Sequence, residues 1–133
     1  MSLVYSAGAL VSSVSDLFKW HQALNNGTLL KKETFQKATT PYQLSSGNRS
    51  EYGFGFFIRN ENGIQSIGHG GAIDGFRAVT IYYPEQDIYI ALLCNSDRDN
   101  FMELFDNIRN PLLGNAFQSS YKDLKISDAI LDS

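Results

Sequence analysis

The 133-residue chain has little cysteine and little net charge, and each shortage excludes a class of protein. Its single cysteine, Cys94, excludes an intrachain disulfide framework and a zinc site built on several cysteines. A formal net charge of −3 argues against a nucleic-acid partner, which requires a basic surface. No apolar run approaches the length of a membrane span, and no basic segment precedes an apolar one near Met1. We therefore expect neither a membrane span nor a signal peptide in this chain.

Aromatic and aliphatic side chains, in contrast, are plentiful. Hydrophobic residues make up 43% of the chain and aromatic residues 13%, while charged residues make up 19%. This composition excludes a disordered, low-complexity chain. The length suffices for one domain with a hydrophobic core and is short for two.

Glycine is concentrated in the middle of the chain, where eight of the 11 glycines lie between Gly47 and Gly75. Tight turns and strands are therefore expected there, and helices on both flanks. A first helix is predicted over residues 15–26, because Ser13 and Asp16 have the spacing of a capping box. A second helix is predicted over 32–38. A third is predicted from near residue 96, with one apolar stripe and a kink or restart at Pro111.

Strands are predicted over 52–58, 64–67, 76–83 and 88–93, with turns at 60–63 and 84–87 and a glycine cluster at 68–71. The segment 88–93 is apolar on both alternations, so it is expected to be covered on both faces. Connections this short favour antiparallel neighbours. The predicted fold class is α+β, with an antiparallel β-meander and flanking helices.

His69 is the first candidate for chemistry. It lies in the run Gly68-His69-Gly70-Gly71, at the expected end of a strand. Small neighbours leave backbone that a ligand can approach, and histidine can donate, accept or transfer a proton near neutral pH. The alternative is a turn histidine among glycines that only the backbone geometry requires. Spacing alone favours this alternative.

The other candidate residues have stronger structural interpretations. His21 lies on the first predicted helix and is expected to be a packed or surface histidine, and Cys94 is expected to be a buried small hydrophobe rather than a nucleophile. Two histidines and one cysteine, widely separated, predict no metal site, and we expect no cofactor. The run Ser119-Ser-Tyr-Lys122 has the Ser-x-x-Lys spacing of penicillin-binding enzymes, but it follows the last predicted helix in a polar segment.

Residues 6–114 resemble the C-terminal part of the serine β-lactamase family, which includes class C β-lactamases, D-alanyl-D-alanine carboxypeptidases and related esterases. Tyr52-Gly-Phe-Gly-Phe56 is similar to the family's Tyr-Gly-x-Gly-Trp strand. The run from His69 to Phe76, His-Gly-Gly-Ala-Ile-Asp-Gly-Phe, is similar to its third catalytic motif, Lys-Thr-Gly or His-x-Gly. Ser6–Trp20 and Leu92–Asn95 fit the segments before and after these motifs.

The resemblance implies a partial β-lactamase/transpeptidase-like fold and a set of roles. In the family, a serine attacks an amide or ester carbonyl and forms an acyl-enzyme. Carried over, Ala72 supplies a backbone N–H to the oxyanion, and His69 stands where a lysine or histidine polarises the pocket. Gly70 and Gly71 would line the path of the substrate. Histidine in place of lysine makes a peptidase, esterase or amidase at least as well matched as a β-lactamase.

The resemblance also implies missing parts. The family's Ser-x-x-Lys and Tyr-x-Asn motifs precede the matched stretch, so residues 1–118 are expected to be the C-terminal portion of a hydrolase domain and residues 119–133 a linker. Such a chain is expected to be inactive alone, although the complete bacterial protein would act on a small-molecule or peptide substrate outside the cytoplasm. The alternative is a non-catalytic binding or scaffold module. Without the family's other strands, the segment 88–93 is left as an exposed strand edge, through which a homodimer can form.

Overall fold

The computed structural model describes residues 8–96 and 100–114, which form one antiparallel sheet and three helices. The elements follow in the order α1 (Val14–Asn25), α2 (Lys32–Ala38), β1 (Phe57–Glu61), β2 (Ile64–Ile73), β3 (Phe76–Tyr83), β4 (Ile88–Cys94) and α3 (Phe101–Leu112). The strand order in the sheet is β1-β2-β3-β4. The predicted α+β meander is therefore confirmed.

Short turns set the register of the sheet. Asn62 and Gly63 join β1 to β2, and both have positive φ angles, 54° and 85°, as a tight hairpin requires. Counting back from this turn, Phe57 lies opposite Gly68. The next turn ends at Gly75, with φ 78°, and places Thr80 opposite His69. The register around the glycine cluster thus follows from two hairpin turns.

Three predicted strand boundaries were wrong by three residues or more. The aromatic segment 52–58 is mostly a turn, with one isolated bridge between Tyr52 and Phe57, and β1 begins only at Phe57. Gly55 has a φ of 82°, which a strand does not allow. The second strand does not end at residue 67 but continues through the glycine cluster to Ile73. The predicted turn at 60–63 has only two residues in the structure, 62 and 63, because β1 extends to Glu61.

The helices lie close to their predicted positions. Ser13 caps α1, where its Oγ accepts a hydrogen bond from the Asp16 backbone N–H at 3.2 Å, and the helix begins one residue before the predicted start. The α2 boundaries are those predicted. The third helix, α3, begins at Phe101 rather than near residue 96. It ends at Leu112, so Pro111 lies in its last turn and no restart follows within the described residues.

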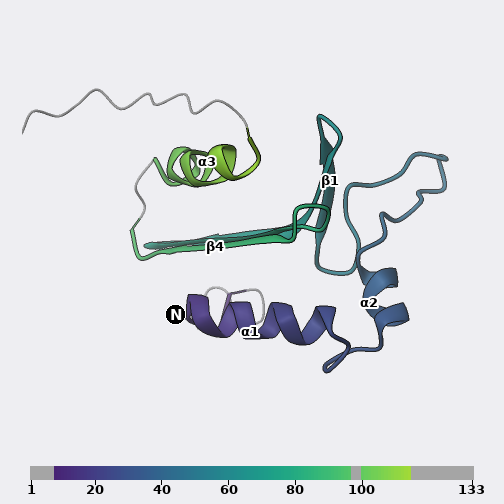
Figure 1. Ribbon diagram of the computed structural model, residues 1–133, viewed down its shortest axis with the longest axis horizontal. Helices are drawn as coiled ribbons and strands as arrows, with labels where there is room; N and C mark the ends of the chain where they lie inside the picture. The colour runs from purple at the N-terminus through teal and green to yellow at the C-terminus, as the bar shows by residue number, and fades with distance from the viewer. Residues whose placement is uncertain (1–7, 97–99, 115–133) are drawn as a thin grey trace, which may run out of the picture.

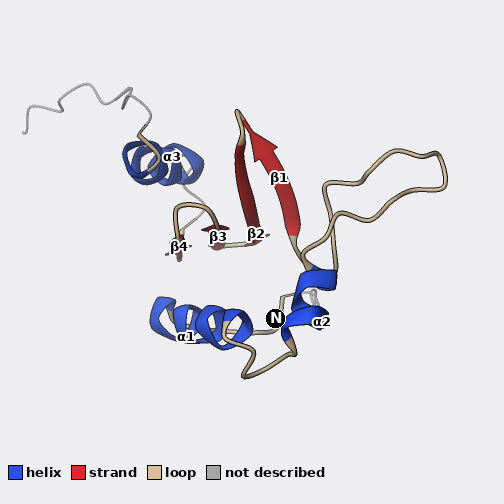
Figure 2. Ribbon diagram, turned by 45° about the vertical axis from the view of Figure 1, so that its right-hand side comes forward, coloured by secondary structure: helices blue, strands red, loops and turns tan. Residues whose placement is uncertain are grey.

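The sheet lies between α1 on one face and α3 on the other (Figures 1 and 2). Against α3, Tyr83, Ile90 and Phe105 form the buried core cluster. Against α1, the Tyr89 hydroxyl donates to the Leu17 carbonyl oxygen at 3.3 Å. The predicted cover on both faces of β4 is therefore confirmed. Among the described strands, β4 pairs only with β3 and forms one edge of the sheet.

Candidate functional site

The second half of β2 has one strand neighbour instead of two. β1 pairs with β2 only as far as Gly68, whereas β3 pairs with β2 from Ile67 to Ile73. Residues 69–73 therefore have an edge that no described strand occupies. His69 lies inside β2, at the beginning of this free edge, and not at the strand end that the sequence predicts. The four residues from His69 to Ala72 are all exposed.

Both ring nitrogens of His69 have hydrogen-bond partners. Nδ1 lies 2.6 Å from the Gly70 carbonyl oxygen, and Nε2 lies 2.9 Å from the Tyr52 hydroxyl. A carbonyl oxygen can only accept, so Nδ1 carries a hydrogen and donates it. In the neutral ring, Nε2 then accepts the hydrogen of the Tyr52 hydroxyl. The Gly70 carbonyl specifies the tautomer, and the two partners together fix the orientation of the imidazole.

Aromatic side chains surround the imidazole, and we call His69, Tyr52 and Phe57 the His69 cluster. The His69 ring lies 5.2 Å from the Phe57 ring and 5.8 Å from the Tyr52 ring, centre to centre. Tyr52 and Phe57 meet edge to face at 4.8 Å, a favoured geometry for aromatic pairs. The Arg59 guanidinium lies 4.8 Å from the Phe57 ring centre and also pairs with Glu51 at 3.6 Å.

The turn after Tyr52 is attached to the end of α2. The Phe54 N–H donates to the Ala38 carbonyl oxygen at 2.9 Å, and the Gly53 N–H donates to the Phe56 carbonyl oxygen at 2.9 Å. A side chain at Gly53 would overlap the Ala38 carbonyl and approach the Ile58 side chain to 2.9 Å. Glycine is therefore required for this close approach, which places Tyr52 beside β2.

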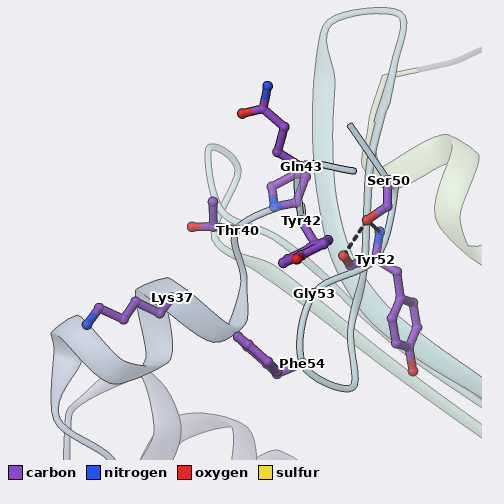
Figure 3. Close-up of a pocket in the computed structure, with 9 residues that line it drawn as sticks. Lys37, Thr40, Tyr42, Gln43, Ser50, Tyr52, Gly53 and Phe54 are labelled. Atoms are coloured by element: carbon purple, nitrogen blue, oxygen red, sulfur yellow. Dashed lines mark hydrogen bonds between the residues drawn. The ribbon is translucent and has the colours of Figure 1, made fainter. Parts of the chain in front are cut away.

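A cavity of about 470 Å³ lies on the other side of the same loop. Its walls include Lys37, Tyr42, Ser50, Tyr52 and Phe54 (Figure 3). Ser50 holds the backbone of Tyr52 here, since its Oγ donates to the Tyr52 carbonyl oxygen at 2.7 Å and accepts from the Tyr52 N–H at 3.2 Å. Tyr52 is thus shared between this cavity and the His69 cluster.

The glycines of β2 have different surroundings. A Cβ at Gly68 would overlap the Thr80 carbonyl oxygen and lie 2.9 Å from the Ile81 Cα, so this glycine is needed for packing of β2 on β3. A Cβ at Gly71 would meet nothing within 4 Å, and one at Gly70 would only contact the Ala78 carbonyl oxygen at 3.5 Å. The space beside Gly70 and Gly71 is open. Consecutive N–H groups of a strand point to opposite edges, so Gly71 or Ala72 directs its N–H to the free edge.

His21 lies in a different environment, as a packed histidine. Its ring stacks on Tyr89 at 4.2 Å and lies 4.5 Å from the Tyr82 ring. Burial lowers the pKa of His21 below its ordinary value, although the negative charge of Asp87 opposes the shift. Burial also raises the pKa values of Tyr82 and Tyr89. These residues line a second cavity of about 770 Å³ that His69 does not line.

The remaining candidates do not join the His69 cluster. Cys94 is half-buried at the end of β4, opposite Arg77. Ser119 and Lys122 lie outside the described residues. Within residues 8–96 and 100–114, no cluster of histidine, cysteine and carboxylate side chains could hold a metal ion. No helix in these ranges is both long and apolar enough to cross a membrane.

Tyr52 and Phe57 were not predicted as partners of His69. The sequence pattern indicated Tyr52 only as the start of a strand. The missed signal was the Asn62-Gly63 turn, because a two-residue hairpin pairs Glu61 with Ile64 and, four residues back, Phe57 with Gly68. This count places Phe57 next to the glycine cluster. The Tyr52 contact depends on the turn over residues 53–56, and the sequence pattern indicated a strand there.

An antiparallel sheet with helices on both faces, and with a His-Gly-Gly strand at a free edge, is the arrangement that the resemblance to the serine β-lactamase family implies. The family model described as Beta-lactamase matches residues 2–114. The chain belongs to the beta-lactamase family, whose members are serine hydrolases. The resemblance stated from the motifs is thereby confirmed.

Known relatives match only in part of their length. Penicillin-binding protein 4* of Bacillus subtilis (strain 168) is 31% identical over 98 residues, which are 72% of this chain and 22% of that protein. A D-aminopeptidase of Brucella ovis is 23% identical over 86 residues, 65% of this chain and 17% of that protein. The octameric penicillin-binding protein homologue from Pyrococcus abyssi superposes with a TM-score of 0.66 at 28% identity, covering 78% of this chain and 25% of that one. The chain therefore spans a quarter or less of these relatives.

Proposed function

We propose that this chain forms the substrate-lining sheet of a serine hydrolase that acts through an acyl-enzyme. The observation that carries the proposal is the free edge of β2 at His69–Ile73, with open space beside Gly71. A substrate chain can lie along such an edge and hydrogen-bond to its backbone. In this arrangement His69 borders the substrate and Ala72 offers a backbone N–H to the oxyanion of the tetrahedral intermediate.

The proposed substrate is a peptide-like amide or an ester. The relatives are a penicillin-binding protein and a D-aminopeptidase by name, and both names fit attack on an amide carbonyl. We propose that the nucleophilic serine and its lysine come from the part of such a protein that lies outside the matched region. The chain alone then has no acylating activity, because neither His69 nor a backbone amide is an activated nucleophile in this site.

A non-catalytic binding module is the second candidate. The observation that favours it is that both ring nitrogens of His69 are already hydrogen-bonded, one to Gly70 and one to Tyr52. A ring engaged in this way can serve to shape the free edge of β2 without taking part in a reaction. In that case the strand would bind a ligand without chemistry.

Covalent labelling separates the two candidates. A fluorophosphonate and a fluorescent penicillin are incubated with this chain and with the product of the complete reading frame that contains it. The proposal predicts no label on the chain and a label on the serine of a Ser-x-x-Lys motif in the complete product. A labelled serine within this chain would refute its inactivity. A complete product that has no Ser-x-x-Lys outside residues 1–133 and takes no label would refute the enzyme and leave the binding module.

A further inference from the structure

We propose that the imidazole of His69 caps the Gly70 carbonyl and so leaves Ala72 as the one residue of the free edge that can form a complete backbone pair with a bound peptide. His69 then determines how long a substrate backbone this edge can hold. The cap is a property of this chain. Its consequence for the substrate rests on the proposed function.

The hairpin register decides which backbone groups of β2 face the free edge. The residues that close a two-residue hairpin form a hydrogen-bonded pair, and bonded and non-bonded pairs alternate along an antiparallel ladder. Counted from the Ile73–Phe76 pair, every second residue of β2 bonds to β3. The Ala78 carbonyl oxygen agrees with this count, since it lies toward β2, 3.5 Å from the place that a Cβ would take at Gly70. The alternate residues, Gly70 and Ala72, therefore direct both their N–H and their C=O groups to the free edge.

The neighbouring strand β1 departs before it can pair with Gly70. Phe57 lies opposite Gly68, so a continued β1 would bring residue 55 opposite Gly70. Gly55 instead has a φ of 82°, and its N–H donates to the Gly53 carbonyl oxygen at 3.2 Å. The Gly70 carbonyl therefore receives no hydrogen bond from β1.

The His69 ring takes the place of this missing strand partner. Its Nδ1 donates to the Gly70 carbonyl oxygen at 2.6 Å, while its Nε2 lies 2.9 Å from the Tyr52 hydroxyl. The ring also lies 5.2 Å from the ring of Phe57, the first residue of β1. The imidazole thus lies between the beginning of β1 and the free edge. An added strand would have to bring its own N–H to Gly70 through this space.

The cap therefore limits what the edge can recognise. An antiparallel peptide that pairs one residue with Ala72 would place the residue two positions further along opposite Gly70. The imidazole excludes that second pair, whereas the N–H and C=O groups of Ala72 stay available. The expected substrate is a short peptide-like amide or ester that the edge holds by the backbone of one residue, rather than an extended strand.

Nuclear magnetic resonance of this chain tests the cap. At a pH where the ring is neutral, long-range ¹H–¹⁵N correlations are expected to show the hydrogen on Nδ1 of His69. His69→Ala should move the carbonyl ¹³C resonance of Gly70 upfield, as for a carbonyl that has lost a hydrogen bond. His69→Asn is the matched control, because its side-chain amide keeps a donor near the position of Nδ1 and should preserve the bonded resonance.

Substrate length tests the consequence in the complete enzyme. kcat/KM is compared for a blocked, uncharged alanine ester and for the same ester lengthened by two alanine residues on either side of the scissile bond. His69→Ala should prefer a lengthened ester by about 2- to 10-fold more than wild type or His69→Asn does, the range expected for one net backbone hydrogen bond. Each preference is a ratio within one variant, so a general loss of activity cancels.

The outcomes separate the cap from the proposed function. Hydrogen on Nε2 of His69 in the wild-type chain overturns the cap, and so does a Gly70 carbonyl resonance that is the same in His69→Ala and His69→Asn. Equal length preferences in these two variants of an active enzyme overturn the limit on substrate length. A complete product that never forms an acyl-enzyme refutes the proposed function instead, and the Gly70 resonance then decides the cap by itself.

Discussion

Two glycines of the same strand are expected to respond in opposite directions to the same substitution. Gly68 is paired with β1 and β3, and a methyl group there would overlap the backbone of Thr80 and crowd the Cα of Ile81. Gly71 is paired with β3 alone, and a methyl group there would enter open space. Gly68→Ala therefore tests packing, and Gly71→Ala tests the free edge without changing the packing.

The expected magnitudes follow from this geometry. Overpacking against backbone that cannot rotate away costs about 2–3 kcal/mol, and the reduced entropy of the unfolded chain returns about 0.4–1 kcal/mol. The free energy of unfolding should therefore fall by about 1–2 kcal/mol in Gly68→Ala. In Gly71→Ala only the entropic gain remains, so the free energy of unfolding should rise by about 0.4–1 kcal/mol. The two melting temperatures should then differ by about 5–14 °C for a domain of this size.

Urea and thermal unfolding measure this difference, with the fluorescence of the single tryptophan, Trp20, and far-ultraviolet circular dichroism as probes. Equal stability of the two variants would refute the distinction between a packing glycine and an open-edge glycine. A Gly71→Ala chain that is less stable than the Gly68→Ala chain would reverse the roles assigned to the two glycines. If the free edge of β2 borders the substrate, as proposed, a methyl group at Gly71 lies in the substrate's path, and Gly71→Ala should lower the acylation rate of the complete enzyme more than Gly68→Ala does.

Three further perturbations test the rest of the fold. Phe105→Ala removes a core side chain that is 2% exposed and should cost about 3–5 kcal/mol in urea unfolding, whereas Met102→Ala on the exposed side of α3 should cost under about 1 kcal/mol. Burial lowers the pKa of His21 in the folded chain, against the opposing charge of Asp87, so the unfolded chain takes up a proton at this histidine first as the pH falls. The free energy of unfolding should therefore decrease below pH 6.5. His21→Gln should remove this pH dependence of the melting temperature. Sedimentation at micromolar concentration should show that the wild-type chain self-associates through the edge strand β4, and Leu93→Lys should reduce this association. A wild-type chain that sediments as a monomer would contradict the prediction.

The meander and its flanking helices could be predicted from the sequence because their signals are local. The Ser13–Asp16 spacing marked the start of α1 to within one residue, and the run over residues 88–93, apolar on both alternations, indicated a strand covered on both faces. These patterns depend on the chain within a few residues. The conformations that these patterns predict therefore do not depend on contacts with distant parts of the chain.

The errors occurred where distant backbone decides the conformation. β2 continues through its glycines because Gly68 packs against the backbone of Thr80, 12 positions along the chain. The segment after Tyr52 turns because Gly53 packs against the carbonyl of Ala38 on α2. Neither contact leaves a periodic pattern in the sequence. The sequence therefore indicated His69 as a candidate, while its hydrogen bond to Tyr52 became visible only in the structure.

Acylation kinetics of the complete enzyme test the central claim most directly. The burst of p-nitrophenol from an uncharged p-nitrophenyl ester measures formation of the acyl-enzyme. If the free edge of β2 borders the substrate, His69→Ala should lower the acylation rate by about 10²-fold or more, as expected for a positioned polar group, with unchanged melting temperature. An unchanged burst rate in the folded His69→Ala enzyme would contradict the claim and leave the glycine cluster a purely structural role.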